Sequence, residues 1–219
     1  MKIVVLAVCH RFWGRCAAVL PSWLRAHDRF QGSMEIRVAY LPDSLPAVAL
    51  DGRVNYVLMD PDVVCVEGKP SKAAIMRELL KDLGSNPPSH ILFTDCDILY
   101  PEDFVPDLID SKASYQVADR IDLTAEETMS FMRLGEIPAT GTINPKKRGM
   151  GWFQFVRWDA LSFVTRQYRW DYKGYDVFDW VLNRDLCVFG DPRILPCSPF
   201  VHLWHGDPGS TWKGTDVDL

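Results

Sequence analysis

Two carboxylates separated by one residue, Asp95 and Asp97, are the first candidates for chemistry in this sequence. They follow the apolar run Ile91–Thr94 and precede a turn over residues 100–103. Burying an unpaired carboxylate costs several kcal/mol, so the pair must reach solvent, a cation or a cation-bound ligand. If the whole run is a strand, the two carboxylates share one face and Cys96 points the other way.

Two histidines three residues apart, His202 and His205, follow an apolar run near the other end of the chain. An imidazole is a common ligand of divalent cations. A single histidine is more often structural, but Asp95 and Asp97 need further ligands, which favours a metal-binding role. Carboxylate oxygens with one imidazole suit Mn²⁺ or Mg²⁺ better than a structural zinc.

Two further acids, Asp176 and Asp179, lie where a helix is expected to begin near Tyr175. Spaced three apart, they would share one helix face. The helix dipole stabilises acids at an N-terminus, and this alone explains Asp176. The alternative is that one of them is a general base facing a pocket lined by Trp and Tyr. From the residues alone both interpretations stay open.

Polar residues also follow the first two expected strands. His10 and Arg11 come after residues 3–9, and Asp43 comes after residues 34–41. Because α/β folds bind ligands at the carboxyl ends of parallel strands, His10 and Arg11 are candidates for nucleotide contact. Asp43 is a candidate for a hydrogen bond to a base or ribose. Helix-start and turn-capping roles are the respective alternatives.

A glycine-rich segment, residues 149–151, precedes an aromatic strand that ends at Arg157. Glycines allow a ligand to approach the backbone closely. Trp152, which follows them directly, is a candidate contact of a bound nucleotide or sugar.

The elements that would position these residues alternate between strand and helix. Val-rich runs without alternation favour strands covered on both faces, and the order strand–helix–strand before Asp95 favours a parallel crossover. Ser71 can cap one helix, and Thr124 with Glu127 can form a capping box. We therefore expect an α/β fold with a mostly parallel central sheet flanked by helices, the helices lying near 16–27 (with a kink or restart at Pro21), 71–83, 121–134, 158–168 and from 175 onward.

Composition narrows the function classes. The chain has 219 residues, 47% of them hydrophobic, and no repeat or linker that would split it. A net charge of −5 and one short basic cluster, residues 146–148, disfavour broad electrostatic binding to nucleic acid. No apolar run approaches the roughly 18–20 residues of a membrane helix. The apolar start is interrupted at His10, so we interpret it as a strand rather than a signal peptide.

The six cysteines are irregularly spaced and include no CxxC pair. This spacing gives no zinc signature. We expect most of them to be small core residues of a reduced, cytoplasmic protein.

Together these motifs resemble a GT-A-type nucleotide-sugar glycosyltransferase, closest to the inverting family-2-like enzymes and the galactosyltransferase C-terminal module. The resemblance rests on Asp95-Cys96-Asp97 as an Asp-x-Asp motif, the glycine-rich aromatic strand, the acidic helix start and the His-Leu-Trp-His segment. It covers most of the chain. It implies a single GT-A (Rossmann-like) domain over 1–219, with a nucleotide-binding half at 1–110 and an acceptor-binding half at 111–219.

The resemblance also implies a reaction. A metal-dependent inverting transferase would move a sugar from a nucleotide-sugar, most simply a UDP-sugar, to an acceptor hydroxyl. Mn²⁺ or Mg²⁺ would be bound by Asp97 and by His202 as the first choice of imidazole, with His205 as the second. Asp95 would bind the metal too, or instead ribose or a metal-bound water.

Asp179 would be the general base of that reaction, because the run that it opens looks like the start of the family's helix. Asp176 is its rival. Such families often carry Glu-Asp at this place, whereas here Val177 follows Asp176, so the assignment of the base is open.

The acceptor and the reaction class leave alternatives. A glycan, a lipid-linked glycan or a modified nucleobase could accept the sugar, and the oligomeric state is open. A metal-dependent nucleotidyltransferase would also use paired aspartates, but residues 10–15 make a poor phosphate loop. A non-catalytic module that binds a nucleotide-sugar or glycan would need no base.

Overall fold

The computed structural model describes residues 1–44, 51–137, 143, 153–167 and 178–204, the side chains at 166, 167, 179 and 180 excepted. The strands within these ranges are β1 Lys2–Val8, β2 Ser33–Tyr40, β3 Val54–Leu58, β4 Cys65–Val66, β5 Lys69–Pro70, β6 His90–Thr94, β7 Ile98–Leu99, β8 Tyr115–Val117, β9 Arg120–Asp122, β10 Phe153–Arg157, β11 Arg193–Ile194 and β12 Phe200–His202. The helices are α1 Trp13–Arg29, α2 Pro61–Val64, α3 Lys72–Lys81, α4 Ala125–Leu134, α5 Trp158–Gln167 and α6 Phe178–Leu186, with short 3₁₀ helices η1 Asp82–Ser85, η2 Pro106–Leu108 and η4 Cys187–Phe189.

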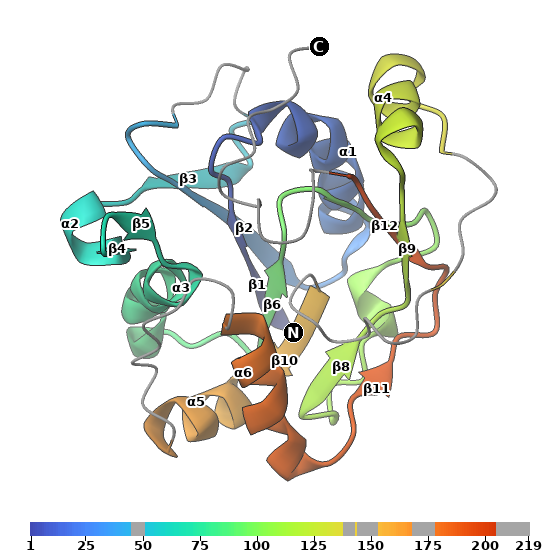
Figure 1. The fold of residues 1–219 in the computed structure, drawn as a ribbon. Coiled ribbons are helices and arrows are strands. Elements are labelled where there is room, and N and C mark those ends of the chain that lie inside the picture. Colours follow the sequence, from blue (N-terminus) through green and yellow to red (C-terminus); the bar gives the residue numbers. More distant parts are fainter. Residues whose placement is uncertain (45–50, 138–142, 144–152, 168–177, 205–219) are drawn as a thin grey trace.

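The described strands form a seven-stranded central sheet in the order β11-β8-β10-β6-β1-β2-β3 (Figure 1). The strands β3, β2, β1 and β6 are mutually parallel, and β11 is parallel to β8. Only β10 runs against its neighbours β6 and β8. This confirms the predicted α/β class with a mostly parallel sheet.

Both faces of the central sheet are covered. Along β1, Ile3, Val5 and Ala7 pack into the core under α1, whereas Val4 and Leu6 pack into the core under α3, α5 and α6. Successive strand residues point to opposite faces, so an unbroken apolar run is what a strand between two helical layers requires. The valine-rich run was therefore a sound signal for a strand of this kind.

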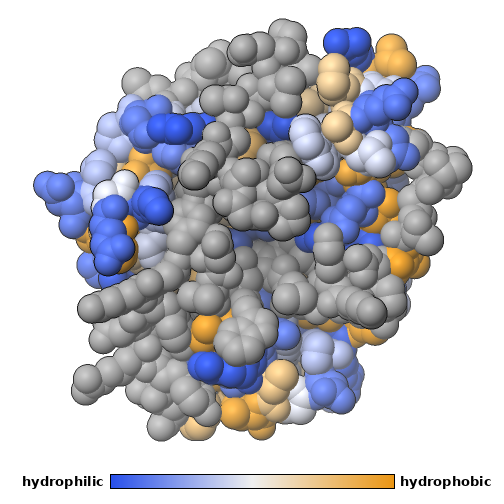
Figure 2. All heavy atoms as spheres, viewed as in Figure 1, coloured by the Kyte–Doolittle hydropathy of each residue, from blue (hydrophilic) through white to orange (hydrophobic). Residues whose placement is uncertain are grey.

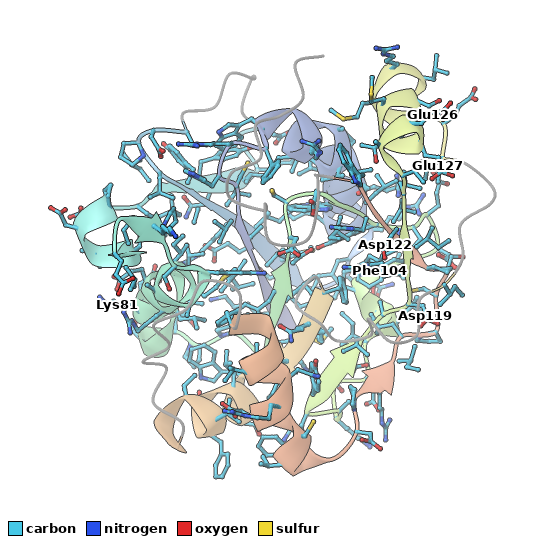
Figure 3. All side chains as sticks on the ribbon, in the orientation of Figure 1. Lys81, Phe104, Asp119, Asp122, Glu126 and Glu127 are labelled. Carbon is cyan, nitrogen blue, oxygen red and sulfur yellow. The ribbon has the colours of Figure 1, made fainter. Side chains whose placement is uncertain are left out.

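A second, three-stranded sheet lies beside the first in the order β7-β12-β9. Four buried rings join it to the central sheet, with centroids 4.3–5.8 Å apart: Tyr100, Phe104, Phe153 and Phe200. In Figure 3 the label of Phe104 lies between those of Asp122 and Asp119, at the height of β9. Offset and edge-to-face aromatic pairs add to the free energy gained by burial alone, so this cluster fixes the small sheet against the large one.

The helix α1 runs as one element through Pro21, and it is longer than the sequence predicted. The turn after Pro21 binds the chain that follows Asp97. The Trp23 indole donates to the Ile98 carbonyl at 2.7 Å, and the Tyr100 amide donates to Ser22 Oγ at 2.9 Å. The first helix thereby supports the Asp-x-Asp segment from behind.

The predicted helix caps are present. Ser71 Oγ accepts from the Ala74 amide at the start of α3, and Thr124 forms a capping box with Glu127 at the start of α4 (Figure 3). The helix predicted over 121–134 is nevertheless too long at its start. Residues up to Asp122 belong to β9, and α4 begins only at Ala125.

The surface is largely hydrophilic over α2 and the β4–β5 hairpin, with small hydrophobic areas at the free end of α4 and along the lower edge in Figure 2. Exposed large hydrophobic side chains include Leu58, Leu134 and Phe163. Scattered exposure of this kind is ordinary for globular proteins. None of the helices in the described ranges combines the length and hydrophobicity that a bilayer-crossing segment requires.

The buried imidazole of His90 makes folding stability depend on pH. His90 is 2% exposed, stacks on Phe155 at 4.9 Å, and has no hydrogen-bond partner for either ring nitrogen among the described residues. Burial, reinforced by the positive charge of Arg157, lowers the pKa of His90 to about 4. The unfolded chain therefore takes up this proton near pH 6.5, but the folded chain does so only near pH 4.

We expect the free energy of unfolding to fall as pH drops from 7 to 4.5, with His90 contributing about 2 kcal/mol of the loss. His90→Phe keeps the stacking and cannot titrate, so it should remove this part of the pH dependence. Urea denaturation at both pH values measures it. His27→Phe is the control, because His27 is only partly buried and bonds to Asp28. Equal pH dependence in the wild type and His90→Phe would contradict the prediction.

Candidate functional site

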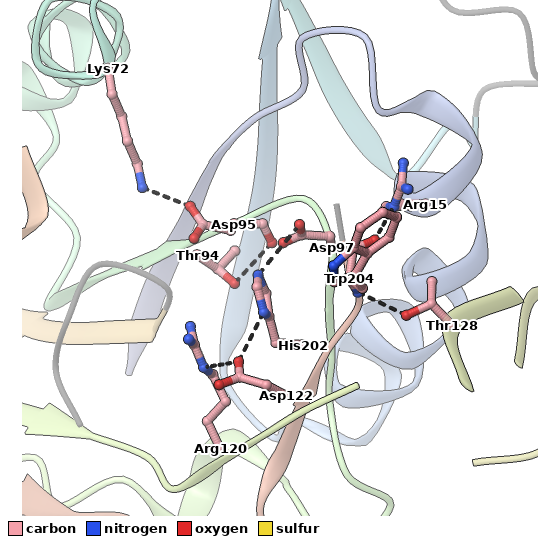
Figure 4. Close-up of polar contacts among 10 residues, drawn as sticks. All are labelled: Arg15, Lys72, Thr94, Asp95, Asp97, Arg120, Asp122, Thr128, His202 and Trp204. Carbon is pink, nitrogen blue, oxygen red and sulfur yellow. Dashed lines mark hydrogen bonds and ion pairs between the residues drawn. The ribbon is translucent and has the colours of Figure 1, made fainter. Parts of the chain in front are cut away.

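The Asp-x-Asp motif forms a turn rather than the end of a strand. β6 stops at Thr94, and Asp95–Asp97 lead into β7. The expectation that both carboxylates share a strand face is therefore wrong. Asp95 faces Lys72 of α3, and Asp97 faces His202 of β12 (Figure 4).

Asp95 is bound by a lysine that sequence reasoning did not single out. Lys72 Nζ donates to Asp95 Oδ1 at 2.6 Å, with the lysine side chain 9% exposed and the aspartate 35%. Partial burial raises the pKa of the Asp95 carboxyl, but the Lys72 ammonium outweighs this and holds that pKa below its usual value, helped by His202 and Arg120. Asp95 is thus a carboxylate whose charge is already compensated.

A topological signal could have identified Lys72. In a parallel crossover, the helix that follows a strand begins at the carboxyl edge of the sheet, which is the edge where Asp95 lies. Lys72 is the first residue of α3, directly after the capping Ser71. A lysine at that position is therefore carried to the end of β6.

Asp97 and His202 face each other across the small sheet. Their Oδ2 and Nε2 atoms are 3.6 Å apart, and both side chains are mostly buried, at 6% and 14% exposed. The Leu203 amide donates to the Asp97 carbonyl at 3.0 Å. Backbone and side chain together hold this carboxylate and this imidazole in one place.

The chain leaving β12 is anchored on two helices. Arg15 Nε of α1 donates to the Trp204 carbonyl at 2.9 Å, and the Trp204 amide donates to Thr128 Oγ1 of α4 at 2.8 Å (Figure 4). The position of His202 is thereby fixed from the segment that follows it as well as from its neighbouring strands.

A further acid, Asp122 on β9, contacts the other nitrogen of the histidine. His202 Nδ1 lies 3.0 Å from Asp122 Oδ1, and Arg120 Nε lies 2.8 Å from the same oxygen. Sequence reasoning missed both residues, because it placed Asp122 in the helix predicted over 121–134 and assigned no role to Arg120. A strand of three residues carries too little alternation to be recognised.

A second group of polar residues gathers where β1 and β2 end. Arg11 pairs with Asp43 at 2.9 Å, and His10 Nδ1 lies 3.7 Å from the same carboxylate. The Arg11 amide donates to Ser44 Oγ at 2.6 Å, and the Trp13 indole donates to the Ser44 carbonyl at 2.7 Å. The structure thus brings together His10, Arg11 and Asp43, which the sequence analysis named separately as candidate contacts of a nucleotide.

Arg11 adopts a backbone conformation that residues other than glycine rarely take, with φ at 64°. Strain of this kind persists only where the surroundings impose it. Burial lowers the pKa of His10 below its usual value, and Arg11 lowers it further, while Asp43 opposes the shift. A neutral imidazole beside an arginine–aspartate pair can offer both a donor and an acceptor to a polar ligand.

The thiol between the two aspartates belongs to the core. Cys96 is 4% exposed and packs with the buried Cys9 and Cys16. Burial, together with hydrogen bonds to the thiols of Cys16 and Cys96, raises the pKa of Cys9 well above its usual value. A thiol with a raised pKa is unreactive. The prediction of core cysteines holds for these three, whereas Cys187 is exposed.

Some predicted site residues cannot be placed. Trp152, Asp176 and His205 lie outside the described residues, and Asp179 is described only as backbone, as the second residue of α6. Among the described side chains, no group of three or more His, Cys, Asp or Glu is arranged to hold a metal ion. Of the predicted metal ligands, the structure therefore brings together Asp97 and His202, and it pairs Asp95 with a lysine.

The solved structures that resemble this chain in fold include two of TarS and one of a mannosyltransferase. TarS of S. aureus is 11% identical over 94% of this chain and 37% of that chain, with a TM-score of 0.56. TarS 1–349 in complex with UDP-GlcNAc is 12% identical over 95% and 60%, also with a TM-score of 0.56. The mannosyltransferase PcManGT from Pyrobaculum calidifontis, in complex with GDP-Man and Mn²⁺, is 13% identical over 93% and 56%, with a TM-score of 0.51.

These likenesses confirm the predicted GT-A type of fold. The chain spans between 37% and 60% of the length of these structures. In sequence it matches no family model and no curated protein.

We expect Lys72 and Asp95 to be energetically coupled. Lys72→Met leaves the carboxylate without its cation and should lower the free energy of unfolding by about 2 kcal/mol, less than for a fully buried pair because Asp95 keeps some solvent. Adding Asp95→Asn should restore part of that loss. Urea denaturation of the two single variants and the double variant measures the coupling.

Lys81→Met is the matched control for this comparison of single and double variants. Lys81 pairs with Glu78 on the exposed side of α3 (Figure 3), where such a pair contributes at most about 1 kcal/mol. Strictly additive losses in the double variant would show that the Lys72–Asp95 pair carries no coupling energy.

Proposed function

We propose that this protein is a metal-dependent inverting glycosyltransferase that moves a sugar from a nucleotide-sugar, most simply a UDP-sugar, to an acceptor hydroxyl. The observation that carries the proposal is the facing pair Asp97 and His202 at the carboxyl edge of a GT-A-type sheet. The named neighbours support the class, since one was solved with UDP-GlcNAc and another is a mannosyltransferase solved with GDP-Man and Mn²⁺.

Two clusters of polar residues at the edge of the sheet would bind different parts of the nucleotide-sugar. The strands β1, β2 and β6 are parallel neighbours, so their carboxyl ends share one edge. His10, Arg11 and Asp43 at the ends of β1 and β2 would bind the base and ribose. Asp95 and Asp97 beyond β6 would face the diphosphate. This is the usual place for a nucleotide in open α/β sheets.

The Asp97–His202 pair fits a divalent cation. Two ligands about 2.1 Å from an octahedral ion are about 3 Å apart, close to the 3.6 Å between Asp97 Oδ2 and His202 Nε2. Mn²⁺ and Mg²⁺ commonly keep waters and take phosphate oxygens beside one or two protein ligands, so a larger cage is unnecessary. Such an ion, when bound, neutralises the charge that grows on the leaving diphosphate.

Lys72 gives Asp95 a role different from that of Asp97. With one oxygen on the ammonium, Asp95 can accept from a ribose hydroxyl or a metal-bound water with the other. Lys72 also adds a positive charge near the expected diphosphate. Asp97 remains the carboxylate for direct metal contact.

The base is proposed from the family resemblance. Asp179, near the start of α6, would take the proton of the acceptor hydroxyl as it attacks the anomeric carbon, and Asp176 is the rival. Both belong to the half expected to bind the acceptor, residues 111–219. That acceptor would be a glycan, a lipid-linked glycan or a modified nucleobase.

We expect Asp97→Ala and His202→Ala each to abolish Mn²⁺-dependent binding of UDP, because each removes a proposed metal ligand. Isothermal titration with UDP, with and without Mn²⁺, measures this. Asp107→Ala on the exposed side of η2 is the control and should bind as the wild type does. Unchanged affinity in Asp97→Ala would rule out the metal model.

We expect Asp179→Asn to lower turnover by about 10²–10⁴-fold while donor binding survives, since general-base assistance has that size. The exposed Asp191→Asn serves as control. A near-normal rate in Asp179→Asn with a large loss in Asp176→Asn would move the base to Asp176.

One assay separates the three function classes. The protein is incubated with Mn²⁺ and either a panel of UDP- and GDP-sugars or a nucleoside triphosphate with a sugar phosphate, and the products are identified. Nucleoside diphosphate release supports sugar transfer, and pyrophosphate release from a nucleoside triphosphate with a sugar phosphate indicates a nucleotidyltransferase. Tight binding without either product indicates a binding module.

A further inference from the structure

The small sheet places His202 between two carboxylates. In the parallel pair of β12 with β9, His202 lies opposite Asp122, and in the antiparallel pair with β7 it lies opposite Ile98, next to Asp97. Paired residues of neighbouring strands project to the same face. The register therefore carries the Asp122 carboxylate to one side of the imidazole, and the turn that precedes β7 brings Asp97 to the other side.

The contact with Asp122 determines which nitrogen of His202 carries hydrogen. A carboxylate only accepts hydrogen bonds, so the 3.0 Å contact requires a hydrogen on Nδ1. In a neutral imidazole the lone pair is then on Nε2, the atom that lies 3.6 Å from Asp97 Oδ2. A lone pair and a carboxylate oxygen repel each other unless a cation or proton lies between them.

Arg120 holds Asp122 in this role. It lies two residues before Asp122 on β9 and so projects to the same face. Its Nε is 2.8 Å from the same Oδ1 that receives the histidine contact, and its side chain is 8% exposed (Figure 4). A buried positive charge this close attracts the carboxylate and disfavours rotamers that would move it away.

We infer that Asp122, held by Arg120, is a positioning residue that fixes the Nδ1–H tautomer of His202 and presents Nε2, together with Asp97, to a divalent cation. The inference rests on the proposed function for the identity of the cation site. Carboxylates behind metal-binding histidines typically change metal affinity by 10–100-fold when they are altered.

The test replaces Asp122 with Asn, which has the same shape but can donate a hydrogen bond to Nδ1. We expect the affinity for Mn²⁺, measured by electron paramagnetic resonance of the free ion in the presence of UDP, to fall 10–100-fold. We also expect ¹⁵N shifts of the neutral His202 ring to move from the Nδ1–H to the Nε2–H pattern. His202→Gln identifies the resonance among the five histidines.

Asp159→Asn is the matched control. Asp159 pairs with Arg157 two residues before it, as Asp122 pairs with Arg120, but at the start of α5. It should leave both the Mn²⁺ affinity and the His202 tautomer unchanged. Arg120→Lys, which keeps the charge but changes its position, should give a smaller loss of affinity and serves in place of Asp122→Asn if that variant does not fold.

The outcomes separate this inference from the proposed function. The tautomer is read without metal, so an Nδ1–H pattern that persists both in Asp122→Asn and in Asp122→Leu, which cannot accept from Nδ1, overturns the positioning role whatever the protein catalyses. A loss of Mn²⁺ affinity with an unchanged tautomer also overturns it, because the effect would then be a general structural one. A shifted tautomer with weaker Mn²⁺ binding supports the role even if no nucleotide-sugar is turned over.

Discussion

The charge of the two carboxylates at the edge of the central sheet is the constraint on which this site depends. Each carboxylate of the motif faces a nitrogen from a different part of the chain. The Lys72 ammonium at the start of α3 compensates the charge of Asp95, and the His202 imidazole of β12 faces Asp97, where a cation or proton between the two would compensate the second charge. A buried charge without a partner is strongly unfavourable. The motif can therefore be buried only where the fold also places these partner groups beside it.

The small sheet β7-β12-β9 carries His202, the residue that faces Asp97. Its strands are only two or three residues long, and such short strands have little stability of their own. They are held by the aromatic cluster around Tyr100, by the bonds from Trp23 and Ser22, and by the anchors on Trp204. The packing energy of the core is thereby used to fix polar groups that would otherwise repel or move.

The sequence revealed local features well and long-range pairings poorly. The valine-rich β1, the capped α3 and the Thr124 capping box were predictable, because each signal lies within a few consecutive residues. The contact of Lys72 with Asp95 spans 23 residues, and that of His202 with Asp122 spans 80. No periodicity encodes such pairs. The aspartates were also assigned to one strand face, because nothing in an apolar run shows that the strand ends at Thr94.

Asp95 and Asp97 contact different groups, and this affects how a donor would bind. With Asp95 committed to Lys72, the described residues offer a cation Asp97 and His202, and phosphate oxygens and water would complete an octahedral shell. Under the proposed function, the cation and the nucleotide then share ligands, so each must raise the affinity of the other by the same factor. Under that proposal, the site would hold metal weakly alone and firmly with the donor.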